Sequence, residues 1–134
     1  MAYKLIRTAV VMMFFLAMAL FSGCGANGVS IAEADNGKQI NLQSGDVMTL
    51  SLESNPTTGY SWQVLEIDDQ ILTQDGDPEY KRATDTDNLV GAGGAETFRF
   101  KGVRAGSTRL ELGYMRPWES VPPVETFSVE VIVQ

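Results

Sequence analysis

The chain has 134 residues, which is enough for one compact domain and too few to argue for two. It carries 17 acidic and 10 basic residues, a formal net charge of −7, which argues against binding to nucleic acid or to a membrane through a basic patch. With no histidine and one cysteine, it excludes a Ser-His or Cys-His nucleophile pair, an internal disulfide and the commonest zinc ligand.

The first part of the sequence has the pattern of an export signal. Lys4 and Arg7 precede thirteen consecutive apolar residues, 9–21, a run too short for a membrane span of about 20 residues. Ser22 and Gly23 supply the small residues of a cleavage site. We therefore expect a signal peptide at 1–23, Cys24 with a short flexible tether at 24–28, and the domain at 29–134.

Cys24, directly after the two small residues, resembles the lipid-modified first residue of a bacterial lipoprotein. The lipoprotein signal box usually has leucine three places before the cysteine, whereas here Phe21 holds that place and Leu20 comes one earlier. The resemblance implies lipid on Cys24 and a protein held in the bacterial cell envelope, in the periplasm or at the cell surface. Plain secretion, with Cys24 free or lost, is the alternative.

Membrane attachment through charge is not expected. Without residues 1–23 the chain keeps 8 basic and 17 acidic residues, a net charge of −9. Any attachment to a membrane would therefore come through the lipid on Cys24.

From Val29 onward, short apolar alternations are separated by turn residues, and no long helical period interrupts them. Period two places Met48, Leu50 and Leu52 on one face of a strand, and it places Trp62 with Val64 in the core. Other expected strands include 29–31, 39–42, 79–82, 98–101, 110–114 and 127–133, and a turn is expected at 35–37. Seven or eight strands with turn signals every 8 to 12 residues favour an all-β, Ig-like antiparallel β-sandwich.

One connection, which we call the NPTTGY loop, has unusually narrow backbone choices. It consists of Asn55, Pro56, Thr57, Thr58, Gly59 and Tyr60. Pro56 fixes its own φ and pushes Asn55 towards extended geometry, the two threonines are β-branched, and Gly59 permits a positive φ. A loop this stiff loses little entropy on binding. An ordinary strand-to-strand turn is the alternative.

Two further stretches are irregular. The glycine-rich stretch is Leu89, Val90, Gly91, Ala92, Gly93 and Gly94, and the RPW loop is Arg116, Pro117 and Trp118. In an Ig-like sandwich the three connections lie between strands B and C, D and E, and F and G, so they emerge at one end. The glycines have a floppy linker as their alternative. For Trp118 the alternative is a core position, and for Arg116 it is a surface ion pair with Glu119.

Together, these three stretches resemble the signature loops of the chagasin family, protein inhibitors of papain-like cysteine proteases, in order and spacing across the expected domain. The resemblance implies an Ig-like fold whose loops enter the protease cleft as a wedge. Thr57 would sit against the catalytic cysteine and histidine of the protease, and the glycine-rich stretch would run beside the non-primed part of the cleft. Trp118 would stack on an aromatic surface on the primed side, held by Arg116 and Pro117.

We therefore expect a reversible inhibitor that is not an enzyme, needs no cofactor or metal and does not bind nucleic acid. An Ig-like adhesive or envelope-assembly module is the alternative function. A third possibility, a glycosidase using Asp85 and Asp87, needs a paired-carboxylate cleft that a loop of a small sandwich seldom provides. The cluster 85–88 lacks the glycine and distal glutamate of a calcium loop, so we interpret it as solvated.

Overall fold

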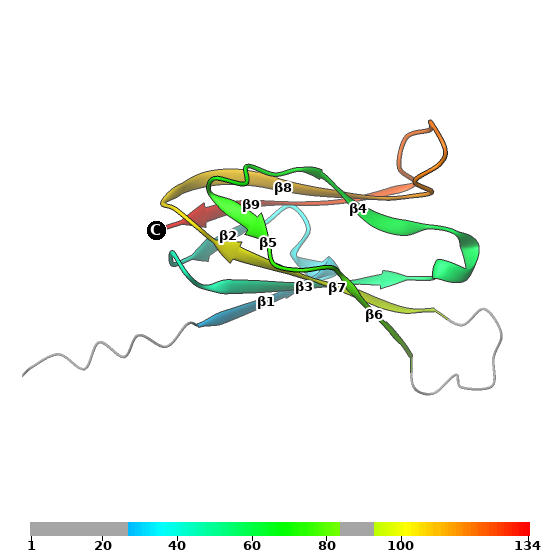
Figure 1. Cartoon of the computed structure of the whole chain (residues 1–134), viewed down its shortest axis with the longest axis horizontal. Coiled ribbons are helices and arrows are strands. Elements are labelled where there is room, and N and C mark those ends of the chain that lie inside the picture. Colours follow the sequence, from blue (N-terminus) through cyan, green and yellow to red (C-terminus); the bar gives the residue numbers. More distant parts are fainter. Residues whose placement is uncertain (1–26, 84–92) are drawn as a thin grey trace, which may run out of the picture.

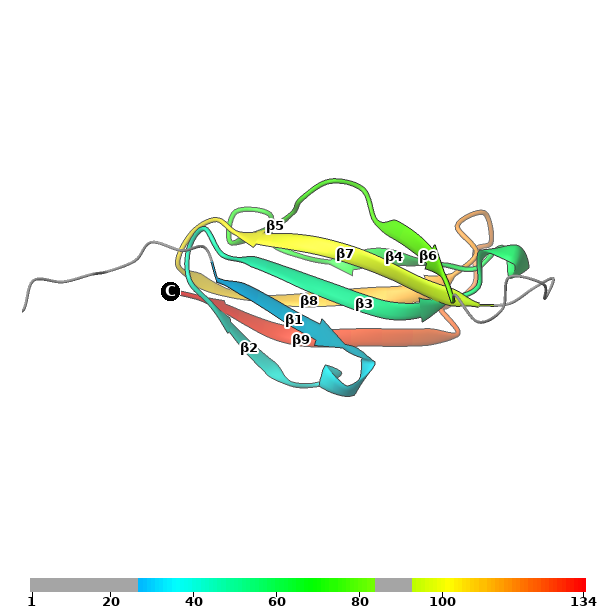
Figure 2. The same cartoon turned by 90° about the horizontal axis from the view of Figure 1, so that it is seen from below.

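The computed structural model describes residues 27–83 and 93–134, and their nine strands form two sheets packed face to face (Figures 1 and 2). Two 3₁₀ turns, η1 (Glu33–Asp35) and η2 (Pro56–Thr58), interrupt them. None of the described residues lies in a helix long and apolar enough to cross a membrane. The all-β sandwich expected from the sequence is confirmed. The strands are β1 (Gly28–Ala32), β2 (Gln39–Leu42), β3 (Val47–Ser54), β4 (Ser61–Glu66), β5 (Leu72–Gln74), β6 (Glu79–Arg82), β7 (Gly94–Gly102), β8 (Gly106–Met115) and β9 (Glu125–Val133).

Sheet A has the order β1-β3-β7-β5, with β6 also pairing with β7, and sheet B has the order β2-β9-β8-β4. Most pairs are antiparallel, but β1 pairs with β3 and β2 pairs with β9 in parallel. The described part of the chain thus has nine strands where the sequence led us to expect seven or eight. The turn at 35–37 does not close a hairpin, because the chain crosses there from sheet A to sheet B and each flanking strand joins an edge in parallel.

The core lies between the sheets and is built by alternation of buried and less buried residues along β3, β7, β9 and most of β8. Full burial of one such side chain contributes about 1.5–3 kcal/mol. Trp62 is 4% exposed, as the sequence predicted. The buried apolar residues are Ile31, Leu42, Met48, Leu50, Leu52, Trp62, Leu72, Phe98, Phe100, Leu110, Leu112, Phe127, Val129, Val131 and Val133.

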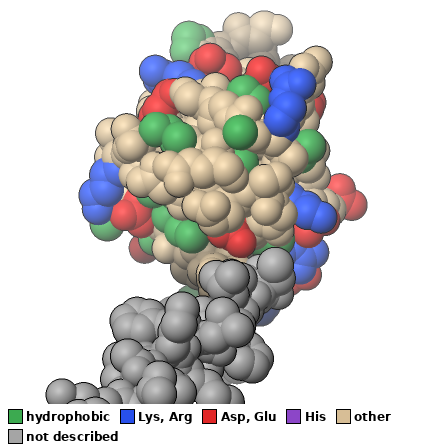
Figure 3. All heavy atoms as spheres, turned by 90° about the vertical axis from the view of Figure 1, so that its left-hand side faces the viewer, with side chains coloured by type: hydrophobic (Ala, Val, Ile, Leu, Met, Phe, Trp, Pro, Cys, Tyr) green, Lys and Arg blue, Asp and Glu red, His purple; other side chains and the backbone are tan. Residues whose placement is uncertain are grey.

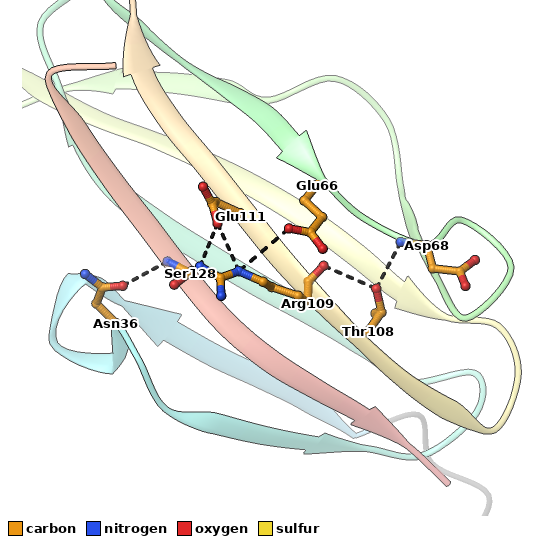
Figure 4. Close-up of polar contacts among 7 residues, drawn as sticks. All are labelled: Asn36, Glu66, Asp68, Thr108, Arg109, Glu111 and Ser128. Carbon is orange, nitrogen blue, oxygen red and sulfur yellow. Dashed lines mark hydrogen bonds and ion pairs between the residues drawn. The ribbon is translucent and has the colours of Figure 1, made fainter. Parts of the chain in front are cut away.

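The outer face of sheet B is polar in its middle (Figure 4). The guanidinium of Arg109 lies 2.7 Å from Glu111 and 3.7 Å from Glu66, so it bridges β8 and β4. At the edge, the Asn36 side chain accepts a hydrogen bond from the Ser128 backbone N–H at 2.8 Å. Exposed ion pairs contribute under about 1 kcal/mol, so the ion pairs of Arg109 add little to the stability of the fold.

The two ends of the sandwich differ. The loop pole is the end where β3 finishes, and the N-terminal pole is the end where β1 begins. Because β1 runs parallel to β3 and starts opposite Val47, the chain enters at the far end from the loops (Figure 1). The seven residue steps from Val47 to Ser54 separate the poles by about 23 Å at ~3.3 Å per residue. Figure 3 looks onto the N-terminal pole, where hydrophobic side chains are separate spots among charges of both signs.

Candidate functional site

The described parts of the three stretches meet at the loop pole. The NPTTGY loop joins β3 to β4, the RPW loop follows β8, and Gly93–Gly94 lead into β7. Because β3 pairs antiparallel with β7 and β4 pairs antiparallel with β8, these strand ends lie together at the loop pole. Residues 89–92 of the glycine-rich stretch, like Cys24 and residues 85–88, lie outside the described residues.

The NPTTGY loop is a compact turn held by its own side chains. Its middle forms η2, in which Thr58 N–H donates to Asn55 O at 3.1 Å and Gly59 N–H donates to Pro56 O at 3.0 Å. Both threonine hydroxyls donate back to Asn55, Thr57 to the side-chain oxygen and Thr58 to the carbonyl, each at 2.6 Å. Gly59 ends the turn with φ +80°, so the positive φ expected there is confirmed.

Arg116 joins the RPW loop to the NPTTGY loop. Its Nε donates to the backbone carbonyl of Thr58 at 3.1 Å, and its guanidinium carbon lies 4.6 Å from the ring centroid of Tyr60. Its Nη1 donates to Glu119 at 3.1 Å, so the ion pair considered from the sequence is present in addition to these contacts. Because a guanidinium is rigid and planar, three contacts on one side chain fix the relative position of both loops.

Trp118 is 70% exposed, so the alternative of a core position is wrong. Its indole nevertheless has a fixed neighbour. A Cβ atom placed on Gly59 would lie 2.6 Å from Cη2 of Trp118, a separation that real atoms do not adopt. The edge of the indole therefore rests on the backbone of Gly59, and its remaining surface faces outward at the loop pole.

A layer of aromatic side chains supports these loops from below. The ring of Tyr114 lies 5.4 Å from that of Tyr60 and 5.2 Å from that of Trp62. The hydroxyl of Tyr114 accepts a hydrogen bond from Asn55 N–H at 2.9 Å, and the indole of Trp62 donates to Glu53 O at 2.8 Å. The alternation of Leu110, Leu112 and Tyr114 predicts that Tyr114 faces inward, but it gives no sign of this contact.

Gly94 is a strand residue, so the linker alternative does not hold for it. It pairs with Ser54 on one side and Arg82 on the other, where a Cβ would lie 2.1 Å from the carbonyl oxygen of Lys81. A glycine is needed here because two backbones approach too closely for any side chain. Gly93 is exposed, and its carbonyl accepts a hydrogen bond from Ala83 N–H at 3.2 Å.

The side chains at the loop pole have the composition of a binding surface. Within 27–83 and 93–134, no group of three or more His, Cys, Asp or Glu side chains is placed to hold a metal ion. The loop pole instead presents rigid backbone, two threonine side chains and a large exposed indole. An indole with an arginine beside it is typical of residues that dominate binding energy at protein interfaces.

Comparisons with known proteins agree with this description. A family model described as chagasin family peptidase inhibitor I42 matches residues 41–131. Amoebiasin-1 of Entamoeba histolytica is 31% identical over 106 residues, covering 79% of this chain and 100% of that protein. EhICP2, a cysteine protease inhibitor from Entamoeba histolytica, has a crystal structure that matches with a TM-score of 0.71 at 23% identity, covering 80% of this chain and 96% of that one. PbICP-C, in a structure of its complex with falcipain-2, matches with a TM-score of 0.54 at 19% identity, covering 81% and 91%.

Members of the matching family are protease inhibitors and not enzymes, so the class of protein is one that acts by binding. The chain belongs to the chagasin family of peptidase inhibitors. The family expected from the three stretches is thereby confirmed. The signal peptide and the lipid on Cys24 fall outside the described residues and stay predictions.

Proposed function

We propose that the protein reversibly inhibits papain-like cysteine proteases by inserting the NPTTGY loop, the glycine-rich stretch and the RPW loop into the active-site cleft. The observation that carries this proposal is the bond from Arg116 to Thr58 O, with the Trp118 indole resting on Gly59. These contacts join two loops into one preformed ridge, and preorganised surfaces bind with a smaller entropy loss. The family match and the relatives described as a cysteine protease inhibitor and as a falcipain-2 complex support the choice of target.

The shape of the ridge suits inhibition rather than cleavage. A protease cleft takes its substrate as an extended chain, whereas Asn55 O here accepts bonds from both the backbone and the side chain of Thr58. In the proposed complex Thr57 at the tip of the turn meets the catalytic cysteine and histidine, and Trp118 stacks on an aromatic surface on the primed side. A contact of standard size would bury about 1,600 Å² in total.

Titration of papain tests the proposal. Every described strand lies between Gly28 and Val133, so a soluble form of residues 25–134 retains the whole sandwich. We expect stoichiometric loss of papain activity at submicromolar concentration. Full protease activity at micromolar inhibitor would contradict the proposal and favour the adhesive or envelope-assembly role instead.

Trp118→Ala examines the proposed contact itself. Because the side chain is 70% exposed, its removal should leave the unfolding temperature nearly unchanged while weakening inhibition by about 2 kcal/mol or more. Thr57→Ala should also weaken inhibition. Val103→Ser, at an exposed site in the turn after β7 at the N-terminal pole, is the matched control. Unchanged inhibition in both loop variants would contradict the assignment of the loops.

We further propose that the protein is exported and held in the bacterial cell envelope by lipid on Cys24. The charged start, the apolar run 9–21 and the small pair before the cysteine support this. Mass spectrometry of the protein from membranes should find an acylated N-terminal cysteine at position 24, and Cys24→Ser should release the protein from the membrane fraction. An unmodified Cys24 in the mature protein would contradict the proposal.

A further inference from the structure

Exposed apolar side chains gather in the connection between β8 and β9. Among the described residues six large hydrophobic side chains are exposed, and three of them, Trp118, Val121 and Val124, fall within seven consecutive residues. Their exposed fractions are 70%, 52% and 59%. Single exposed apolar residues need no explanation, but several of them in one short connection indicate a surface that binds something.

The connection holds these side chains in a fixed arrangement. At its start Glu119 N–H donates to Arg116 O at 3.0 Å, and at its end Val124 N–H donates to Tyr114 O at 3.0 Å. Between these bonds, Pro122 and Pro123 each have a fixed φ. The exposed valines therefore project from a stiff loop, which loses little conformational freedom when a partner covers it.

The group continues onto the outer face of sheet B. A Cβ on Gly113 of β8 would lie 2.6 Å from Cγ of Pro123 and 2.8 Å from Cδ1 of Leu65, so Pro123 and Leu65 pack side by side over this glycine. Leu65 itself is 46% exposed. We call the set Leu65, Trp118, Val121, Pro123 and Val124 the apolar strip.

The apolar strip extends from the loop pole through the connection before β9 to Leu65 of β4. Figures 1 and 2 place the connection at the same end of the sandwich as the turn between β3 and β4. The N-terminal pole, in contrast, has its hydrophobic side chains scattered among charges (Figure 3). One member of the strip, Trp118, already belongs to the proposed protease contact.

We propose that the apolar strip extends the protease-binding surface beyond Trp118 and packs on an apolar wall of the protease beside the primed side of its cleft. This inference rests on the proposed function. The occupant is the protease, because the strip begins at Trp118 and is held by Arg116 and Tyr114, the residues that position the loops. A protease seated on Trp118 brings its own surface over Val121 and Val124, within six residues along a stiff loop.

The test compares Val121→Ser combined with Val124→Ser against the matched control Val103→Ser, an exposed valine of similar exposure, 46%, at the N-terminal pole. Each variant is measured for papain inhibition by residues 25–134, with association and dissociation rates and the unfolding temperature. We expect the double variant to raise the inhibition constant about tenfold, mainly through faster dissociation, because apolar contacts change dissociation more than encounter. The control should keep the wild-type constant, and the unfolding temperature should stay unchanged in both.

Each other outcome is decisive. If the double variant inhibits as well as wild type while Trp118→Ala inhibits poorly, the contact ends at Trp118 and the inference fails, although the proposed function stands. If wild type does not inhibit papain at all, the proposed function and this inference fail together. Concentration-dependent dimerisation of wild type that the double variant abolishes, with inhibition unchanged, would assign the strip to a second copy of the chain and overturn the inference.

Discussion

The hydroxyl of Tyr114 accepts a hydrogen bond from the backbone N–H of Asn55 at 2.9 Å. Tyr114 belongs to β8 of sheet B and Asn55 follows β3 of sheet A, so this bond connects the two sheets beneath the NPTTGY loop. The ring of Tyr114 is itself fixed between Tyr60 and Trp62. The loop with the proposed protease contact is thus positioned by a strand residue that lies outside it.

Tyr114→Phe removes this acceptor and keeps the ring. Loss of this hydrogen bond costs about 0.5–1.5 kcal/mol, so we expect lower stability towards denaturant and weaker inhibition through faster dissociation. Hydrogen exchange at the Asn55 amide should accelerate, which an unspecific loss of packing would not single out. Tyr60→Phe is the control for stability, because the Tyr60 hydroxyl makes no hydrogen bond within the described residues. Unchanged exchange at Asn55 would contradict this role of Tyr114.

Arg116→Lys keeps the charge and removes the planar fork. Lysine cannot reach Thr58 O, Glu119 and the face of Tyr60 together, so we expect inhibition to weaken about tenfold or more with a small loss of stability. The matched control is Arg104→Lys, since Arg104 makes an exposed side-chain bond to Gln70 near the N-terminal pole. Inhibition constants for both variants, measured at low and high salt, separate lost geometry from lost charge. Equal constants for Arg116→Lys and wild type would show that the fork is not required.

Gly59→Ala has a natural comparison in Gly37→Ala. Both glycines have φ +80°, but a Cβ meets Trp118 at 2.6 Å in the first case and nothing within 4 Å in the second. Each variant should lose about 1 kcal/mol or more from backbone strain. Gly59→Ala alone should also displace Trp118, change its fluorescence and weaken inhibition. The same effect of both variants on fluorescence and inhibition would contradict the contact between Gly59 and Trp118.

Asp35 gives a prediction for pH. Its carboxylate accepts hydrogen bonds from Ala32 N–H at 2.9 Å and Lys38 Nζ at 3.0 Å, and these contacts lower its pKa below the ordinary value of 3.8. A lowered folded-state pKa contributes stability that is present above the unfolded pKa of about 3.9 and lost as pH falls through the folded value. Asp35→Asn should therefore be less stable than wild type at pH 7, and the difference should shrink below about pH 4.

Denaturant unfolding at pH 7 and pH 3 measures this effect. Asp77→Asn is the control, since Asp77 is exposed and makes no hydrogen bond or ion pair with any described residue. A difference between wild type and Asp35→Asn that stays constant with pH would show that the carboxylate charge is not the source.

The fold was predictable where one face of a strand is buried. Period two along 48–52 and 127–133 identified core residues because a sheet with one wet face imposes that alternation. The parallel pairing of β1 and β2 was not predictable, because the edge that a short strand joins depends on how its connection crosses between the sheets. The common end of the described parts of the three stretches followed from topology alone.

The contacts within the site could not be predicted from the sequence. Trp118 is compatible with a buried or an exposed position in its local sequence, and only the packing on Gly59 decides between them. Gly94 reads as a linker residue, although the backbone of Lys81 requires a glycine there. The hydrogen bond that the Asn55 N–H donates to the Tyr114 hydroxyl joins positions 59 residues apart, a separation over which no local pattern carries information.

The parallel start of β1 beside β3 has a practical consequence. Because the described chain begins at the pole about 23 Å from the loops, material attached ahead of Gly28 leaves the opposite surface unobstructed. A bead, a dye or a fatty chain attached at the N-terminal pole therefore lies far from the loop pole, which stays accessible. Immobilisation through the N-terminal pole should therefore preserve the full capacity to bind the proposed target protease from solution.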